Sequence, residues 1–222
     1  MAIHYKEDNI YNIHEYNIDI KTHELYLFGE EIYMTGTGDE VAAEQGVEYT
    51  MANKFIRNLN ILSRKSTGNI LIHMKTCGGD WHEGMAIYDA IKACPNFVTI
   101  INYTHARSMS SLIFLAADFR VMMPHSTYMY HEGTFGTSGT TKQARTELTE
   151  LQKSNDQMIE IYVDHLKTKG NKKSWSKKRI RKWLVDQMNQ YEEVYLSAED
   201  AVKHGFANEV FTEMKNYIEV LP

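Results

Sequence analysis

The chain has 222 residues, of which 43% are hydrophobic and 24% charged, and its formal net charge is −5 at pH 7. These are ordinary globular values, so they exclude a disordered chain and predict a sizeable core. The acidic balance gives no reason to expect nucleic acid as a partner, and the sequence has neither a run of about 18 apolar residues nor the apolar core of a signal peptide. Without such a run, we expect no membrane association. Cys77 and Cys94 are too few for a disulfide framework, which is typical of a reducing compartment, so we expect a cytoplasmic protein.

The N-terminal segment is expected to hold little regular structure. Residues 1–22 are polar and rich in tyrosine, without helical periodicity, and we interpret them as a flexible arm that precedes a single domain over 23–222. The segment ELYLFGEEIYM alternates in the manner of a hairpin around Gly29. The run from Thr35 to Gly46 contains turn residues and acids with little to bury, which predicts a mobile loop.

From residue 47 onward, helical and strand patterns alternate. An amphipathic helix is predicted by apolar residues three and four apart, namely Met51, Phe55, Leu59 and Leu62. The short apolar runs NILIHMK and FVTIINY are typical of strands, and each is followed by a helical pattern, MAIYDAIKA and MSSLIFLAA. This alternation predicts an α/β fold with a mainly parallel sheet and right-handed crossovers. Near the C-terminus, SAEDAVKHG predicts a short helix capped by Ser197 and closed by Gly205.

Candidate functional residues lie at the carboxyl ends of the predicted strands, where ligands bind in such sheets. A serine hydroxyl such as that of Ser108 needs an adjacent base, and acyl transfer also needs fixed N–H donors for the oxyanion. The first amides of a helix are unpaired, which makes the N–H of Met109 a natural donor. Gly79 lets the backbone approach a substrate closely, and His131 ends the second strand of RVMMPHSTYMYHEG. We therefore predict Ser108 as nucleophile, His131 as base, and Gly79 and Met109 as oxyanion donors.

Four segments resemble the ClpP family, the serine protease subunit of the Clp system: in chain order, GGDWHEGMAIYDAIKACPNFVTI, ARSMSSLIFLAAD, MYHEG and YLSAEDAVKHGFANEV. The resemblance covers roughly residues 24 to 211, and the family uses the same separation between Gly79 and Ser108, 108 − 79 = 29. It implies a ClpP/crotonase-like spiral of β-β-α units. It also implies a serine endopeptidase that cleaves unfolded proteins or peptides without a cofactor or metal. Glu193 stands where the family has the triad aspartate, with Asp186 or Glu192 as alternatives.

The same resemblance implies an assembly. Residues 141–169 match the family's handle helix, which joins two rings face to face in that family. We therefore expect a homo-oligomer, as a ring or a double heptameric ring, to which an AAA+ unfoldase ATPase delivers unfolded protein. The segment 170–190 is expected to be an inserted helix, and its Lys/Arg run from 172 to 182 a solvated face rather than a nucleic-acid site.

Departures from the family keep other functions open. Cys77 stands where the family carries proline, Arg107 puts a bulky charge beside the candidate nucleophile, and Glu193 replaces the triad aspartate; Arg107 and Glu193 motivate a catalytically silent subunit. The alternatives are a catalytically silent ring subunit and a crotonase-type acyl-CoA enzyme, although the chain shows no glycine-rich acyl-CoA loop. A zinc site at His73, Cys77 and His82 lacks a second ligand pair, and nothing in the sequence indicates a lowered pKa for a Cys77 thiol nucleophile.

Overall fold

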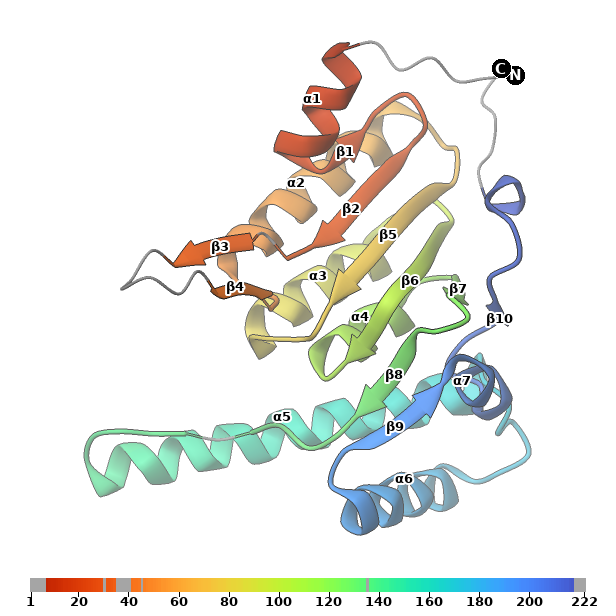
Figure 1. The fold of residues 1–222 in the computed structure, drawn as a ribbon. Helices are drawn as coiled ribbons and strands as arrows, with labels where there is room; N and C mark the ends of the chain where they lie inside the picture. The colour runs from red at the N-terminus through yellow and green to blue at the C-terminus, as the bar shows by residue number, and fades with distance from the viewer. Residues whose placement is uncertain (1–6, 30, 35–40, 45, 135, 218–222) are drawn as a thin grey trace.

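The computed structural model describes residues 7–217 apart from 30, 35–40, 45 and 135. The strands within these residues are β1 (Ile18–Asp19), β2 (Glu24–Phe28), β3 (Glu31–Met34), β4 (Val41–Glu44), β5 (Ile70–Thr76), β6 (Val98–Arg107), β7 (Phe119–Met122), β8 (Thr127–Tyr130), β9 (Val194–Ser197) and β10 (Glu209–Val210). The helices are α1 (Glu7–Tyr16), α2 (Tyr49–Lys65), α3 (Trp81–Ala93), α4 (Met109–Ala116), α5 (Thr141–Thr168), α6 (Lys177–Tyr191), α7 (Ala198–His204) and the 3₁₀ turn η1 (Met214–Asn216). The predicted α/β fold class is confirmed (Figure 1).

The main sheet has eight strands and is mostly parallel. Its order is β1-β2-β5-β6-β7-β10, and β8 pairs with both β6 and β9. The pairs β1–β2 and β8–β9 are antiparallel, and the other pairs in this sheet are parallel. Strand β6 has ten residues, so its first half pairs with β7 and its second half with β8. The carboxyl ends of β6 and β8 therefore lie side by side, and so do the residues that follow them.

Helices α2, α3 and α4 cover one face of this sheet (Figure 1). All eight residues of α4 are buried, which makes it the central helix of the fold. The apolar core that joins the sheet to these helices includes Leu25, Ile72, Ile100, Leu112 and Phe114. Within the described residues, no helix combines the length and apolarity needed to cross a bilayer.

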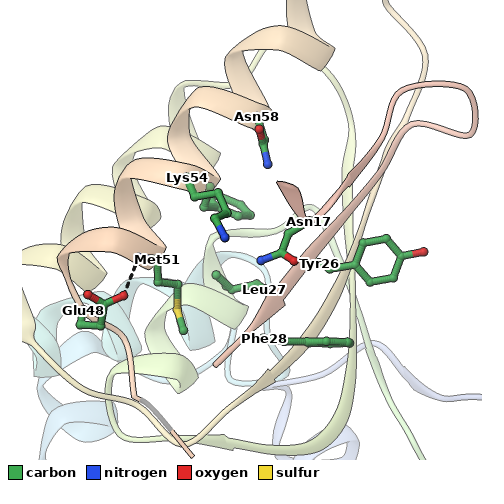
Figure 2. A pocket seen from close by; sticks show the side chains of 9 residues that line it. Asn17, Tyr26, Leu27, Phe28, Glu48, Met51, Lys54 and Asn58 are labelled. Atoms are coloured by element: carbon green, nitrogen blue, oxygen red, sulfur yellow. Dashed lines mark hydrogen bonds between the residues drawn. The ribbon is translucent and has the colours of Figure 1, made fainter. Parts of the chain in front are cut away.

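The predicted amphipathic helix is confirmed as α2. Phe55, Leu59 and Leu62 are buried, and the helix begins after Glu48, whose carboxylate accepts hydrogen bonds from the amides of Thr50 and Met51. Figure 2 shows this cap, with Met51 beside it, at the start of the helix. The carboxylate satisfies two of the amides that a helix leaves unpaired at its first turn.

The prediction that residues 1–22 lack helix is wrong for Glu7–Tyr16, which forms α1. Asn17 ends this helix with φ 57°, a left-handed conformation that asparagine tolerates better than most residues. The side-chain amide of Asn58 on α2 donates to the carbonyl of Tyr16, which ties the end of α1 to the body. A helix held in place by such tertiary contacts needs only a weak sequence pattern, and this explains the miss.

The predicted hairpin around Gly29 is also wrong. Strand β2 pairs in parallel with β5, while β3 pairs with β4 in a separate two-stranded sheet. The alternating sequence was typical of strands but did not identify their partners. The predicted loop from Thr35 to Gly46 contains β4, and residues 35–40 and 45 of that prediction lie outside the described residues.

Helix α5 has 28 residues, Thr141–Thr168, and agrees closely with the element predicted over 141–169. Its second half is buried through Met158, Ile159, Tyr162, Val163, His165 and Leu166. Its first half projects past the body (Figure 1). Leu148 in this half is 43% exposed. The helix predicted in the segment 170–190 is α6, which packs along α5.

Candidate active site

Ser108 occupies a sharp turn between β6 and α4. Its φ of 53° and ψ of −127° lie outside the regions that non-glycine residues favour, at a cost of about 1–3 kcal/mol. The Ser108 amide donates to the carbonyl of Met129 on β8 at 3.1 Å, and its own carbonyl accepts from the amide of Ser111 at 3.0 Å. The turn is thus held from two sides, and it presents the half-buried side chain of Ser108 at the strand end.

His131 follows β8 directly, and its Nε2 lies 2.8 Å from Oγ of Ser108. Register explains the proximity, because Arg107 on β6 pairs with Met129 on β8. Burial lowers the pKa of His131, and the negative charges of Glu193 and Glu192 oppose this shift. A neutral imidazole that accepts the serine proton at Nε2 must carry its own proton on Nδ1.

The glycine pair, Gly78 and Gly79, lies in the loop between β5 and α3, called the glycine loop below, and packs against the Ser108 turn. A Cβ on Gly78, whose φ is +101°, would lie 2.7 Å from the carbonyl oxygen of Arg107 and 2.8 Å from Cβ of Ser108. Contacts this short leave room for glycine alone. The two segments can therefore approach closely only because the side chain is absent.

A short strand-like contact anchors the glycine loop from the other side. The amide of Val47 donates to the carbonyl of Gly78 at 2.6 Å, and the amide of Asp80 donates to the carbonyl of Val47 at 2.8 Å. Adjacent residues of an extended segment point their N–H groups to opposite sides. The N–H of Gly79 between them is thus directed away from Val47 and is not used in this contact.

Met109 is the first residue of α4, and the Ser108 side chain does not cap its helix end. The N–H of Met109 thus belongs to the unpaired, partially positive amides of a helix N-terminus. The Met109 side chain is buried over Gly84 of α3, where an added Cβ would lie 2.0 Å from Cγ of Met109. The buried side chain thus holds Met109 in place at the start of α4.

The candidate triad acids are less firmly held. The β8–β9 pairing ends at Tyr130 and Val194, so His131 and Glu193 are the next residues beyond the paired ends, and the charge of Glu193 acts on the imidazole. However, Glu193 is exposed, and its Oε2 accepts a hydrogen bond from the hydroxyl of Tyr195 at 2.9 Å. Among the described residues, none offers a carboxylate hydrogen-bonded to the His131 ring.

The two alternative acids differ in their position. Glu192 precedes Glu193 with φ 59°, in a turn at the end of α6, and it has the weaker effect on the pKa of His131. Asp186 lies on α6, where Lys182 holds its carboxylate at 2.8 Å, and the carboxylates that act on the pKa of His131 are those of Glu193 and Glu192. Of the three predicted acids, Glu193 thus has the strongest electrostatic effect on the imidazole.

An open groove of about 620 Å³ runs between the glycine loop and α5, with Ser108 and His131 in its wall. Its apolar lining includes Trp81, Met109, Leu112, Leu151 and Met158. Asn155 on α5 accepts from the amide of Gly133 at 2.9 Å and so fixes the loop that follows His131.

A second hollow of about 980 Å³ lies on the other side of His131 and contains the two candidate glutamates. The imidazole stands between the two hollows.

A third cavity, between β2 and α2, is lined by Asn17, Leu27, Glu48, Lys54 and Asn58 among others (Figure 2). Its volume of about 10 Å³ is at the threshold for a single water molecule. It contains none of the predicted catalytic residues and is too small for a peptide.

Of the three residues considered for zinc, His73 is already engaged by other side chains. His73 is buried, with Nε2 2.9 Å from a carboxylate oxygen of Glu24 and Nδ1 2.9 Å from the hydroxyl of Tyr103. Both ring nitrogens are therefore occupied. In the described part of the chain, no cluster of three or more His, Cys, Asp or Glu side chains is arranged to hold a metal ion.

The basic segment of α6 pairs with acids of the same chain. Arg181 contacts Asp156 and Glu160 on α5, at 2.7 Å in the case of Glu160. These exposed pairs indicate that this part of the 172–182 run is solvated, whereas Lys172 at its start is buried, with its Nζ 4.2 Å from the ring centroid of Trp183.

Sequence reasoning missed two residues that support this site, Val47 and Asn155. Val47 is the lone aliphatic residue in the polar stretch EQGVEYT, and this isolation was an available signal. Asn155 carried no signal, because one polar residue on a long helix usually faces solvent.

Comparison with known proteins gives consistent results. The family model for Clp protease matches residues 36–214. The ATP-dependent Clp protease proteolytic subunit of Deinococcus radiodurans is 28% identical over 172 residues, which cover 76% of this chain and 78% of that protein. The subunit of the same name from Streptococcus gordonii is 29% identical over 186 residues, which cover 81% of this chain and 88% of that one.

A solved structure, a ClpP1 mutant from Listeria monocytogenes, superposes with a TM-score of 0.67 over 88% of this chain and 95% of that chain. The two sequences are 19% identical, so this similarity supports the fold and no more than the fold.

Proposed function

Because the chain belongs to the Clp protease family, we propose that it is a serine endopeptidase with Ser108 as nucleophile and His131 as general base. The observation that carries the proposal is the 2.8 Å contact between Oγ of Ser108 and Nε2 of His131. Independent support comes from the backbone of Ser108, whose positive φ is the kind of strain that proteins retain at functional sites.

The proposed mechanism begins when Oγ of Ser108 attacks the carbonyl carbon of a peptide bond. His131 accepts the serine proton at Nε2 and returns it to the leaving amine, and water then releases the acyl group by the same steps in reverse. The N–H groups of Gly79 and Met109 would stabilise the oxyanion. One such donor is worth about 2.7–4 kcal/mol in other serine proteases.

Glu193 is the proposed triad acid. It would accept the Nδ1 proton of His131 and hold the ring in the tautomer that leaves Nε2 free. The end of the β8–β9 pairing supports this choice, because Glu193 directly precedes Val194, the partner of Tyr130, and its charge acts on the imidazole. To reach the imidazole, the carboxylate has to leave the hydroxyl of Tyr195, an exchange between exposed groups that costs little.

The proposed substrate is an extended, unfolded polypeptide. The groove beside Ser108 is open to solvent, and main-chain hydrogen bonds to the Gly79 and Gly133 loops would bind many sequences. The relatives' names describe proteolytic subunits of an ATP-dependent protease. We infer that this chain likewise forms a homo-oligomeric ring served by an AAA+ ATPase, with the projecting half of α5 as the contact between rings.

The test is hydrolysis of an unstructured fluorogenic peptide by the purified protein, compared with Ser108→Ala. We expect steady cleavage that disappears in the variant while the oligomeric state and melting temperature are preserved. Equal cleavage by the variant would overturn the proposal, because a contaminating or different activity would then be responsible.

A second candidate is a catalytically silent ring subunit. It is favoured by one observation, the hydrogen bond that holds Glu193 on Tyr195 instead of His131. An assembled, well-folded ring that hydrolyses no peptide, with or without an ATPase partner, would support this candidate over the protease.

A further inference from the structure

A buried chain of hydroxyl groups connects α5 to the Ser108 turn. Oγ of Ser111, on α4, lies 2.6 Å from the carbonyl oxygen of Ser108 and 2.5 Å from the hydroxyl of Tyr162 on α5. Ser111 and Tyr162 are both fully buried. Because water does not compete with these contacts, they are stronger than the same bonds at the surface.

The chemistry of the groups fixes the direction of both hydrogen bonds. A carbonyl oxygen only accepts, so the Ser111 hydroxyl must donate its single proton to Ser108. Ser111 Oγ then has only lone pairs left, and the Tyr162 hydroxyl must donate to it. The result is a directional relay from Tyr162 through Ser111 to Ser108.

The carbonyl of Ser108 shares a peptide plane with the N–H of Met109. In a trans peptide these two groups are coplanar and point in opposite directions. Two donors from Ser111, its amide at 3.0 Å and its hydroxyl, fix the carbonyl and therefore also the direction of the Met109 N–H.

We propose that Ser111 and Tyr162 are positioning residues, which orient the Met109 N–H toward the oxyanion of the reaction. The inference rests on the proposed protease function and deepens it. Neither side chain needs to touch the substrate. Their effect should fall on transition-state stabilisation, and the binding of the substrate and the basicity of His131 should be unaffected.

The chain supplies matched controls for both residues. Ser110 is the neighbour of Ser111 on α4, and Tyr130 packs against Tyr162 with 5.6 Å between ring centroids. Both are fully buried, and within the described residues neither hydroxyl has a hydrogen-bond partner. Ser110→Ala and Tyr130→Phe thus remove buried hydroxyls from the same region without touching the relay.

The experiment measures kcat, KM and the pH dependence of peptide hydrolysis for Ser111→Ala, Tyr162→Phe, their double variant and the two controls. We expect each relay variant to lower kcat on the order of tenfold, less than the loss of a whole oxyanion donor. The KM and the acidic limb of the pH profile should stay in place. The double variant should lose little more than Ser111→Ala, because the relay is already broken at Ser111.

The isosteric Ser111→Cys variant adds a graded test. A thiol is a weaker donor than a hydroxyl, so its kcat should lie between those of wild type and Ser111→Ala. Equal kcat values in relay and control variants would overturn the inference. So would a relay effect confined to KM or to the melting temperature.

Amide hydrogen exchange of the segment 108–112 provides a readout that does not depend on activity. The relay predicts faster exchange in Ser111→Ala and Tyr162→Phe than in either control. If the wild-type protein hydrolyses no peptide, the proposed function fails, and the exchange rates alone decide whether the relay holds the turn. Unchanged exchange in both relay variants would then contradict the inference.

Discussion

The two sides of His131 are built in contrasting ways. On one side, Ser108 sits in a strained turn against Gly78, and Met109 is buried and packed over α3. On the other side, Glu192 and Glu193 are exposed, and neither carboxylate is hydrogen-bonded to the imidazole. The difference teaches that the fold of one chain fixes the proposed nucleophile and oxyanion donors, whereas the proposed acid is an exposed side chain that the fold does not hold against the imidazole.

The largest expected effect comes from replacing His131, the residue between the two sides. His131→Ala removes the proposed base and leaves Ser108 with no partner for its proton. We expect kcat for peptide hydrolysis to fall by about four to six orders of magnitude. Retention of activity to within tenfold of wild type, in protein that melts normally, would show that His131 is not the base.

A smaller but still large loss is expected when the packing of the glycine loop is broken. Gly78→Ala puts a methyl group against the Arg107 carbonyl at a φ of +101°, which displaces the loop from the Ser108 turn. We expect kcat to fall by about 10²–10³-fold, the loss typical of a missing oxyanion donor.

The matched control for that variant is Gly136→Ala. Gly136 lines the same groove, but an added Cβ there meets nothing within 4 Å. Its kcat should stay within about twofold of wild type. A similar loss of kcat in both variants would contradict this prediction, because any methyl group added to the groove would then slow the reaction, whether or not it disturbs the contact of Gly78 with the Ser108 turn.

The acid side should respond more weakly. Glu193→Gln removes the proposed partner of Nδ1, and we expect a loss of kcat of about 10- to 100-fold, below that of a buried triad aspartate because Glu193 is exposed. Glu192→Gln should cost no more than about threefold. A larger loss for Glu192 than for Glu193 would exchange their proposed roles.

The smallest expected effect is a shift along the pH axis. Burial lowers the pKa of His131 below the value of about 6.5 that is usual for histidine, so the imidazole stays neutral to a lower pH. Activity is then lost only as the pH falls through this lowered pKa. The negative charge of Glu193 favours the protonated imidazole. Glu193→Gln should therefore move the acidic limb of kcat/KM to still lower pH, and a shift to higher pH would contradict this account.

A helix or strand was predictable where its own residues show the apolar spacing of that element, and its neighbours in the fold were not. Phe55, Leu59 and Leu62 sit at helical spacing and face the core, so α2 was predictable. Gly205, at φ 90°, ends the predicted C-terminal helix after a Ser197 cap. The partner of β2 was not predictable, because alternation along a strand carries no information about which strand lies beside it.

The candidate site shows the same division. Ser108, His131 and the glycine pair follow strand ends or precede a helix, and chain order alone brought them to one edge of the sheet. Which carboxylate serves His131 depends on side-chain rotamers of adjacent glutamates, and sequence reasoning had to leave this open. The relay from Tyr162 was invisible to sequence, because a tyrosine in an apolar stripe is usually only a core residue.

The central claim is that Ser108 is activated by His131, and labelling with a fluorophosphonate probe tests it most directly. We predict a single adduct on Ser108, located by tandem mass spectrometry, that forms rapidly in the wild-type protein and is lost in His131→Ala. A folded, assembled protein that takes up no probe, or that carries the adduct on another residue, would contradict the account.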